Sequence, residues 1–283
     1  MNVADAMTPR SEVVTAEIPG TRDEALVHLQ QGSFSSMPAV KRDDDGEDFR
    51  GIVSRNDLIE RPNEDQLALL VREVPTISEN ASIEELTQLM IEENSRRIPV
   101  VDGQLEGIVT ITDVIRAIAD GDVDTDATAD DIATRNVNTT YAGAPLAVAE
   151  SGLQYANDPY AIILDDDGEM VGILTEVDVI EVANVVEGED DTGDSIAGQD
   201  DEWMWEGIKA VGNRYLPTRN VEFPDGPASE FMTSDVVTVS AHNSVRDVAQ
   251  SMITNDIEQV PLFEGGELVR IVRDVDILSA VGR

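Results

Sequence analysis

The sequence predicts an α/β (α+β) fold in which four copies of one β-α-β-β-α unit follow one another along the chain. The first observation is a heptad that occurs four times, as GIVSRND at 51–57, GIVTITD at 107–113, GILTEVD at 172–178 and RIVRDVD at 270–276. The second is a constant spacing, because a Thr or Asn marker precedes a Pro or Ala by 23 residues in every copy. These pairs are Thr15 and Pro38, Thr76 and Pro99, Asn138 and Ala161, and Thr238 and Pro261. Four copies in one register identify an internal repeat.

The first half of each repeat is predicted to be a short strand followed by an amphipathic helix. The strand ends at the marker, and the helix begins six residues later. These helix starts are Thr21, Ser82, Ala144 and Ser244. Glu85 after Ser82, and Asp247 after Ser244, complete the pattern of a capping box. Apolar residues then recur on one helical face.

The second half is predicted to be a hairpin of two aliphatic strands followed by another helix. The first strand is MPAV, IPVV, AIIL or VPLF, an Asp/Gly turn follows, and the front of the heptad is the second strand. The last helix starts around the heptad aspartate. Strands with an unbroken aliphatic run need cover on both faces, which favours the α/β class.

The intervals between repeats predict the domain organisation. The four markers are 61, 62 and 100 residues apart, so the fourth repeat follows an insertion. We predict a first pair of repeats at 1–120 (repeats at about 1–62 and 63–120), an acidic linker at 121–131, and a second pair at 132–283 (repeats at about 132–186 and 228–283). The insertion at 187–227 joins an acidic, Gly-containing run, expected to be flexible, to a segment expected to be ordered. The second segment holds both tryptophans, Trp203 and Trp205.

The net charge limits the kinds of partner. It is −39, from 58 acidic and 19 basic residues, and only Lys41 and Lys209 are lysines. Such a surface repels nucleic acid and anionic lipid, so we expect neither as a partner. The pattern is typical of proteins from salt-accumulating haloarchaea, since at molar salt the Debye length falls to roughly 3 Å and carboxylate repulsion is screened.

Several other classes of protein and site are excluded or disfavoured. The chain has no cysteine, which excludes disulfides, thiol nucleophiles and thiolate metal sites. His28 and His242 are assigned to the scaffold, and no catalytic triad order, phosphate-binding loop or metal cluster occurs, so we predict no catalytic residue and no metal. The aspartates of the linker imitate a calcium-binding rhythm, but its glycine and terminal glutamate are missing. With no signal-peptide core and no membrane-spanning stretch, we expect a soluble, cytoplasmic protein.

The strand with its proline, the turn and the pattern G-h-h-S/T-x-x-D resemble the cystathionine β-synthase (CBS) domain. The resemblance covers nearly the whole chain apart from the insertion. Two such units pack as a Bateman module, so the resemblance implies two Bateman modules that bind adenosine-containing ligands (AMP, ADP, ATP or S-adenosylmethionine) in clefts between paired repeats. In the family, the heptad Asp takes the ribose hydroxyls, and the Ser or Thr contacts phosphate. The opening-strand residue lies near the ligand, and the backbone around the strand with the proline frames the base.

The heptad residues suit such a ligand but also have a simpler explanation. A hydroxyl before a helix, beside free backbone N–H groups, is an anion site, and a carboxylate can accept both hydrogen bonds of a cis-diol. The glycine removes a side chain where a ligand must approach. The same S/T-x-x-D pattern is also a capping box, which a helix after a strand needs in any case.

The repeats are unequal as candidate sites. In repeat three Asn138, Ala144 and Ala161 replace the usual residues, and in repeat four Arg270 and Arg273 replace the glycine and the hydroxyl. Arg273 either binds phosphate or closes the cleft, and repeats one and two are expected to carry the better sites. The candidate ligand-binding residues are Thr15, Ser54, Arg55, Asp57, Thr76, Arg97, Pro99, Thr110, Asp113, Asn138, Thr175, Asp178, Thr238, Arg273 and Asp276.

We therefore predict a non-enzymatic regulatory sensor that needs no cofactor, binds an adenine nucleotide or S-adenosylmethionine, and reports to a regulated protein partner. The alternative is a scaffolding protein with empty clefts that recruits a partner through Trp203 and Trp205, which otherwise pack against a module. An enzyme with its chemistry in the insertion is disfavoured. The sequence leaves open whether the four repeats of one chain close into a disc or two chains do so as a homodimer.

Overall fold

The structure, a computed structural model, describes residues 1–31, 36–43, 46–54, 57–58, 61, 64–156, 158–182, 184–187, 219–264 and 267–281. The chain divides into two compact units, one formed by Met1–Arg135 with Val237–Arg283 and the other by Asn136–Val236. The first unit therefore holds repeats one, two and four, and the second holds repeat three. Arg55, Trp203 and Trp205 lie outside the described residues.

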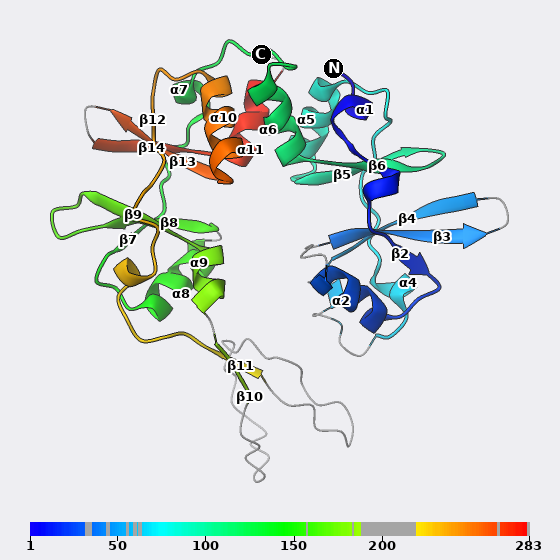
Figure 1. Cartoon of the computed structure of the whole chain (residues 1–283), viewed down its shortest axis with the longest axis horizontal. Coiled ribbons are helices and arrows are strands. Elements are labelled where there is room, and N and C mark those ends of the chain that lie inside the picture. The colour runs from blue at the N-terminus through cyan, green and yellow to red at the C-terminus, as the bar shows by residue number, and fades with distance from the viewer. Residues whose placement is uncertain are drawn as a thin grey trace, which may run out of the picture. The chain divides into compact units, whose positions relative to one another are not determined.

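Repeat one forms a three-stranded sheet with a covering helix (Figure 1). Its elements are β2 (Ala16–Ile18), α2 (Arg22–Gln31), β3 (Ser36–Asp43) and β4 (Gly46–Ser54). β2 is parallel to β3, and β3 is antiparallel to β4, as a β-α-β-β order requires. Asp57 and Leu58, which follow β4, are helical.

Repeat two comprises α5 (Ile83–Glu92), β5 (Arg97–Asp102), β6 (Gln104–Thr110) and α6 (Ile111–Asp120). Its opening segment makes one parallel bridge, between Ile77 and Val100, in place of a full strand. The predicted capping box at the start of α5 is confirmed, because the Ser82 N–H donates to Glu85 Oε2 at 2.9 Å and the Glu85 N–H donates back to Ser82 Oγ at 3.2 Å. Both bonds satisfy N–H groups that the helix leaves unpaired.

Repeat four belongs to the same compact unit as repeat two. Its elements are β12 (Val239–Ser240), α10 (Val245–Asn255), β13 (Gln259–Glu264), β14 (Glu267–Arg273), α11 (Asp274–Ile277) and η3 (Leu278–Ala280). α10 and α6 pack side by side (Figure 1). One buried apolar cluster includes Val114 and Ile118 of α6 together with Val248 and Met252 of α10. This cluster ties repeats two and four together.

Repeat three repeats the plan in the second unit. Its elements are β7 (Thr139–Tyr141), α8 (Leu146–Ala156), β8 (Tyr160–Leu164), β9 (Met170–Thr175) and α9 (Glu176–Val182). β7 is parallel to β8, and β8 is antiparallel to β9. The predicted α/β fold of repeated β-α-β-β-α units is thereby confirmed.

Two details of the predicted repeat are wrong. The strands β2, β7 and β12 begin one residue after their markers instead of ending there, because their parallel partners β3, β8 and β13 are first met at that point. The start of α8 is displaced by one residue. Pro145, and not Ala144, makes the bridge (to Pro227) that the other repeats make from their helix-start residues. Counted from the marker, the helix of repeat three therefore begins one residue later than the helices of the other repeats.

A short segment precedes each repeat, and we call these segments the leaders: residues 2–9, 66–72, 128–134 and 227–233. Each leader contains a helical turn, namely α1 (Val3–Ala6), α4 (Leu67–Leu70), α7 (Ala129–Ile132) or η2 (Ala228–Glu230). The leaders of repeats one and two are exchanged. β1 (Thr8–Pro9), followed by η1 (Arg10–Glu12), pairs with β6 of repeat two, and Arg72 bridges Ile52 on β4 of repeat one.

The leaders of repeats three and four are exchanged in the same way. Thr134 bridges Ile271 of repeat four, and Thr233 bridges Ile173 of repeat three. The exchange is stabilised by apolar burial. Leu67 and Leu70 from the leader of repeat two are only 2% and 1% exposed, within the core of repeat one. Full burial of one such side chain contributes about 1.5–3 kcal/mol.

The heptad glycines admit these leaders. A Cβ atom at Gly51 would clash with the Arg72 carbonyl oxygen, and one at Gly107 would clash with the Thr8 carbonyl oxygen. Gly51 also has a φ of 135°, which residues with a side chain avoid. The expectation that the glycine makes room for a ligand is therefore corrected, since the group that approaches it is the leader of another repeat.

The insertion is bounded by a short hairpin-like pair. β10 (Asn184–Glu187) pairs antiparallel with β11 (Arg219–Glu222), so the two ends of the insertion meet. The acidic run and the tryptophan segment predicted between them lie outside the described residues.

Candidate ligand-binding site

Each heptad ends a strand at its fourth residue, and in repeats two, three and four a helix starts at the next residue. In repeat two, Thr110 is the N-cap of α6, and its backbone N–H and Oγ1–H both donate to Asp113 Oδ2, each at 2.8 Å. In repeat three, Thr175 donates the same two bonds to Asp178 Oδ2, at 2.8 and 2.7 Å. The capping box that the sequence predicts is present, so a ligand would have to share the aspartate with it.

Repeats one and four use their aspartates in the same manner. The Ser54 N–H and Oγ–H donate to Asp57 Oδ2 at 3.0 and 2.5 Å. In repeat four, the backbone N–H and Nε–H of Arg273 donate to Asp276 Oδ2 at 2.9 and 3.0 Å. Because capping uses Oδ2 in every repeat, Oδ1 is the oxygen through which these carboxylates meet other groups. We call Oδ1 the outer oxygen.

The outer oxygens have different partners. Arg72 pairs with Asp57 through its Nε, and Arg273 donates from Nη2 to Asp276 at 2.9 Å. The contact in repeat two is longer, since Arg116 Nη1 lies 3.3 Å from Asp113 Oδ1. The two arginine side chains are about equally exposed, at 54% for Arg116 and 56% for Arg72. Among the described residues, no arginine pairs with the outer oxygen of Asp178, whose sequence neighbour Thr175 bonds only to Oδ2. The four carboxylates thus differ in how much acceptor capacity they retain.

Repeats one and two meet at the ends of their central strands. Ser36 lies opposite Ser54 in the pairing of β3 with β4, and Arg97 lies opposite Thr110 in the pairing of β5 with β6. Arg97 Nη1 donates to Ser36 Oγ at 2.7 Å, so this guanidinium connects the two heptad neighbourhoods. Burial and the nearby charge of Arg96 lower the pKa of Arg97 from its usual value. A half-buried guanidinium between two hydroxyl-bearing strand ends can bind an anionic group such as phosphate.

Arg96, which with Arg97 was expected to supply positive charge for a ligand, serves another contact. It pairs with Asp274 and lies 3.2 Å from Glu258 Oε2, both in repeat four. The two neighbouring arginines therefore contact different parts of the chain, Arg97 meeting repeat one and Arg96 meeting repeat four. Asp274 is 4% exposed, and its burial, with Glu258 and Asp276 nearby, outweighs Arg96 and raises the pKa of Asp274 to about 6.

The other predicted residues are scattered over the repeats. Thr15 accepts a bond from Arg10 Nη2 at 3.2 Å, and Asn138 donates from Nδ2 to the Tyr160 carbonyl at 2.9 Å. Pro99 is buried within β5, where its carbonyl accepts the Ile77 N–H at 3.1 Å. Thr238 is exposed just before β12. Asn138 and Pro99 therefore bond within their own sheets, and the groups that can bind a nucleotide are those of the heptads together with Arg97.

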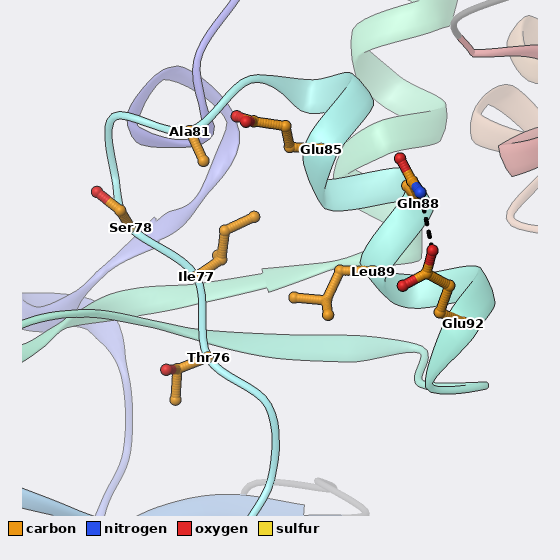
Figure 2. Close-up of a pocket in the computed structure, with 8 residues that line it drawn as sticks. All are labelled: Thr76, Ile77, Ser78, Ala81, Glu85, Gln88, Leu89 and Glu92. Atoms are coloured by element: carbon orange, nitrogen blue, oxygen red, sulfur yellow. Dashed lines mark hydrogen bonds between the residues drawn. The ribbon is translucent and has the colours of Figure 1, made fainter.

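Figure 2 shows a groove of about 390 Å³ on repeat two, between the segment Thr76–Ser78 and α5. Glu85, Gln88 and Glu92 line its helical side, and the Gln88 side-chain amide donates to Glu92 at 2.8 Å. Of the predicted site residues, only Thr76 lies in it. Two carboxylates on the wall repel phosphate, so this groove does not suit a nucleotide.

No cluster of three or more His, Cys, Asp or Glu side chains that could hold a metal ion occurs among the described residues. None of the helices among them is long and apolar enough to cross a membrane.

Comparison with known proteins defines the class. A family model described as the CBS domain matches residues 3–64, 68–120, 129–184 and 228–283. The chain belongs to the CBS domain family and carries four CBS repeats, as predicted from the heptads.

Particular relatives resemble the whole chain. The uncharacterized protein MJ1404 of Methanocaldococcus jannaschii is 24% identical over 281 residues, which cover 99% of this chain but 61% of MJ1404. The uncharacterized protein MJ1225 of the same organism is 25% identical over 292 residues and 95% of both chains. A crystal structure of an uncharacterized conserved protein from Pyrococcus horikoshii matches with a TM-score of 0.69 at 27% identity, over 99% of both chains. The crystal structure of MJ1225 matches with a TM-score of 0.63 at 21% identity, also over 99% of both chains, which is a likeness of fold.

Sequence reasoning missed two residues at the heptads, Ser36 and Arg72. Ser36 carries no signal beyond its place at the start of a strand. Arg72 does carry one, because the corresponding leader positions in the other three repeats are Thr8, Thr134 and Thr233. An arginine at a position otherwise occupied by threonine could have been noticed once the leaders were aligned.

Proposed function

We propose that the protein is a non-enzymatic regulatory sensor that binds adenosine-containing ligands between paired CBS repeats. The ligand is an adenine nucleotide or S-adenosylmethionine, as the family resemblance implies. The pairs are repeats one with two and three with four, which form two Bateman modules. The exchange of leaders within each pair supports this pairing, since each repeat completes its core with a segment of the other.

The observation that carries the proposal is the chemistry gathered at the heptads. The carboxylates of Asp113 and Asp178 each retain an outer oxygen that can accept hydrogen bonds from a ribose diol. Thr110 and Thr175 stand at helix N-termini, whose N–H groups favour phosphate. The half-buried Arg97 supplies positive charge that a protein with a net charge of −39 must provide locally for an anionic ligand.

The proposal is tested by calorimetry and thermal melting in molar KCl with AMP, ADP, ATP, S-adenosylmethionine and plain adenosine. A ligand that binds only the native protein should raise the melting temperature. Asp178→Asn should weaken every ribose-containing ligand that enters repeat three. Arg97→Gln should weaken the nucleotides more than adenosine, because only the nucleotides carry phosphate.

The matched control is Asp247→Asn, which alters the capping box of α10 and no heptad. It should leave affinities unchanged. If no member of the ligand panel binds the wild-type protein, the scaffolding function with empty clefts takes the place of the sensor.

A sensor acts through a protein that it regulates, and we propose such a protein partner in a salt-rich cytoplasm. The absence of a recognisable catalytic constellation in the sequence supports a role through binding. Size-exclusion chromatography with and without the bound ligand would show whether the ligand changes assembly of the chain into a homodimer.

A further inference from the structure

We propose that Arg72 closes the ribose subsite of repeat one, so that Asp57 does not receive a ligand while the ion pair is intact. This inference rests on the proposed function, because it concerns which heptads of the sensor take the adenosine moiety. It reverses the expectation that repeats one and two carry the better sites. Repeats two and three become the open sites.

The acceptor capacity of Asp57 is nearly used up. A carboxylate offers about four lone-pair positions. Ser54 occupies two of them on Oδ2, and Arg72 occupies a third on Oδ1. Asp57 is only 3% exposed. A cis-diol needs two acceptor positions at once, and they are not present here unless Arg72 leaves.

The backbone holds Arg72 against the heptad. Its N–H donates to the Ile52 carbonyl at 2.8 Å, and its carbonyl accepts the Ile52 N–H at 2.9 Å. The leader of repeat two is further anchored by the buried Leu67 and Leu70. The backbone of Arg72 is therefore fixed beside repeat one, and its side chain reaches Asp57 from that position. The ion pair is a consequence of leader exchange and is not a chance contact between two mobile side chains.

The other leaders carry a threonine at this position. Thr8 takes the place of Arg72 against repeat two, Thr134 against repeat four and Thr233 against repeat three. A threonine is too short and carries no charge with which to neutralise the aspartate. In repeat two, Arg116 lies 3.3 Å from Asp113 on the same helix, a longer contact without the leader backbone that holds Arg72, so a ligand can displace it. Repeat four is closed by its own Arg273.

The test replaces Arg72 by the threonine of the other leaders. Calorimetry of the full chain with ADP and with S-adenosylmethionine in molar KCl should show one more binding site in Arg72→Thr than in the wild-type protein, or affinity about tenfold higher at an existing weak site, the size expected for releasing a charge-assisted acceptor. The double variant Arg72→Thr with Asp57→Asn should lose that gain. Thr8→Arg should have the reciprocal effect and remove one site, that of repeat two.

The charge-matched control is Arg50→Thr, because Arg50 forms a solvent-exposed pair with Asp48 on β4. It should bind as the wild-type protein does. Arg72→Gln, which keeps much of the side-chain stem, repeats the experiment if the threonine variant folds poorly by circular dichroism.

The outcomes separate the two proposals. If Arg72→Thr binds more weakly than the wild-type protein, Arg72 contacts the ligand and does not close the subsite. If binding is unchanged, or absent in both proteins, closure by Arg72 is also refuted. If the wild-type protein binds nothing but Arg72→Thr binds one ligand, the sensor function fails for the natural chain while the closure stands.

Discussion

The buried Asp274 should make the contact between repeats two and four sensitive to pH. Its pKa is raised to about 6 in the folded protein, chiefly by burial, against about 3.9 in an unfolded chain. Arg96 from repeat two, with Glu258 and Asp276 from repeat four, are the charged groups that act on it. Because the neutral acid is the form that the fold favours, ionisation of Asp274 costs stability as the pH rises through its folded pKa.

The magnitude follows from the difference in pKa. About two pKa units at about 1.4 kcal/mol each amount to roughly 3 kcal/mol. The stabilisation is fully present below about pH 4, where both states are protonated, and is lost above about pH 6. Other carboxylates act in the opposite sense, among them Asp247, whose pKa is lowered by its bonds with Ser244. The measurement must therefore be a difference between two proteins.

The assay compares urea unfolding of the wild-type protein with that of Asp274→Asn, at several pH values and constant molar KCl. The asparagine variant cannot titrate, so the stability difference in favour of the wild-type protein should grow by up to about 3 kcal/mol from pH 8 to pH 4. Glu258→Gln gives a second, milder test. Removing that negative neighbour should lower the pKa of Asp274 and move the transition to lower pH. A stability difference that stays constant over this range would refute the reasoning.

Three further predictions concern salt, the heptad and the leader exchange. Transfer from molar to millimolar KCl should loosen or unfold the protein, because the Debye length grows roughly tenfold between about 1 M and about 0.01 M salt and carboxylate repulsion is no longer screened. An unchanged circular dichroism spectrum and melting temperature would contradict the halophilic interpretation. Thr110→Val should cost about 1 kcal/mol of stability without ligand, whereas Asp113→Asn should leave the ligand-free protein nearly unchanged and weaken ligand binding about tenfold. Lower stability of Asp113→Asn at unchanged affinity would assign this heptad to capping alone. Gly107→Ala should destabilise the protein by about 1–3 kcal/mol, because the added Cβ meets the Thr8 carbonyl. Its control is Gly152→Ala, which lies in open space on α8 and should stabilise the protein by roughly 0.5–1 kcal/mol. Equal effects of the two substitutions in denaturant unfolding would argue against the close approach of the leader to Gly107.

Much of the local structure was predictable from the chain. The capping boxes at Ser82 and Ser244, the hairpins and the strand-to-helix change at Thr110 all join residues a few positions apart. Their energies depend on neighbouring residues, so the pattern alone indicates them. The single extra residue before α8 was missed because Ala144 and Pro145 are equally poor caps by sequence and only the strand pairing distinguishes them.

The site was predicted at the level of residue types, and repeats three and four were expected to be the poorer sites, but Asp57 and Asp113 were not distinguished. The sequence places repeats one and two together because their heptads share one pattern. In the structure their outer oxygens are not equivalent, since Arg72 reaches Asp57 from a leader that belongs to another repeat. Which residue meets an aspartate across two repeats is not encoded in either heptad.

The residues of this chain taken alone therefore determine four repeats, their strands and helices, and the net charge of −39. Tertiary structure decides which leader completes which core, that Arg97 joins the two heptad neighbourhoods of repeats one and two, and that Arg96 pairs with Asp274, 178 residues away. The physical reason lies in the repetition itself. A repeated pattern has nearly the same local energy in every copy, so it cannot specify which copies meet. That choice depends on long-range packing and on the side chains that differ between copies, such as Arg72 and Asp274.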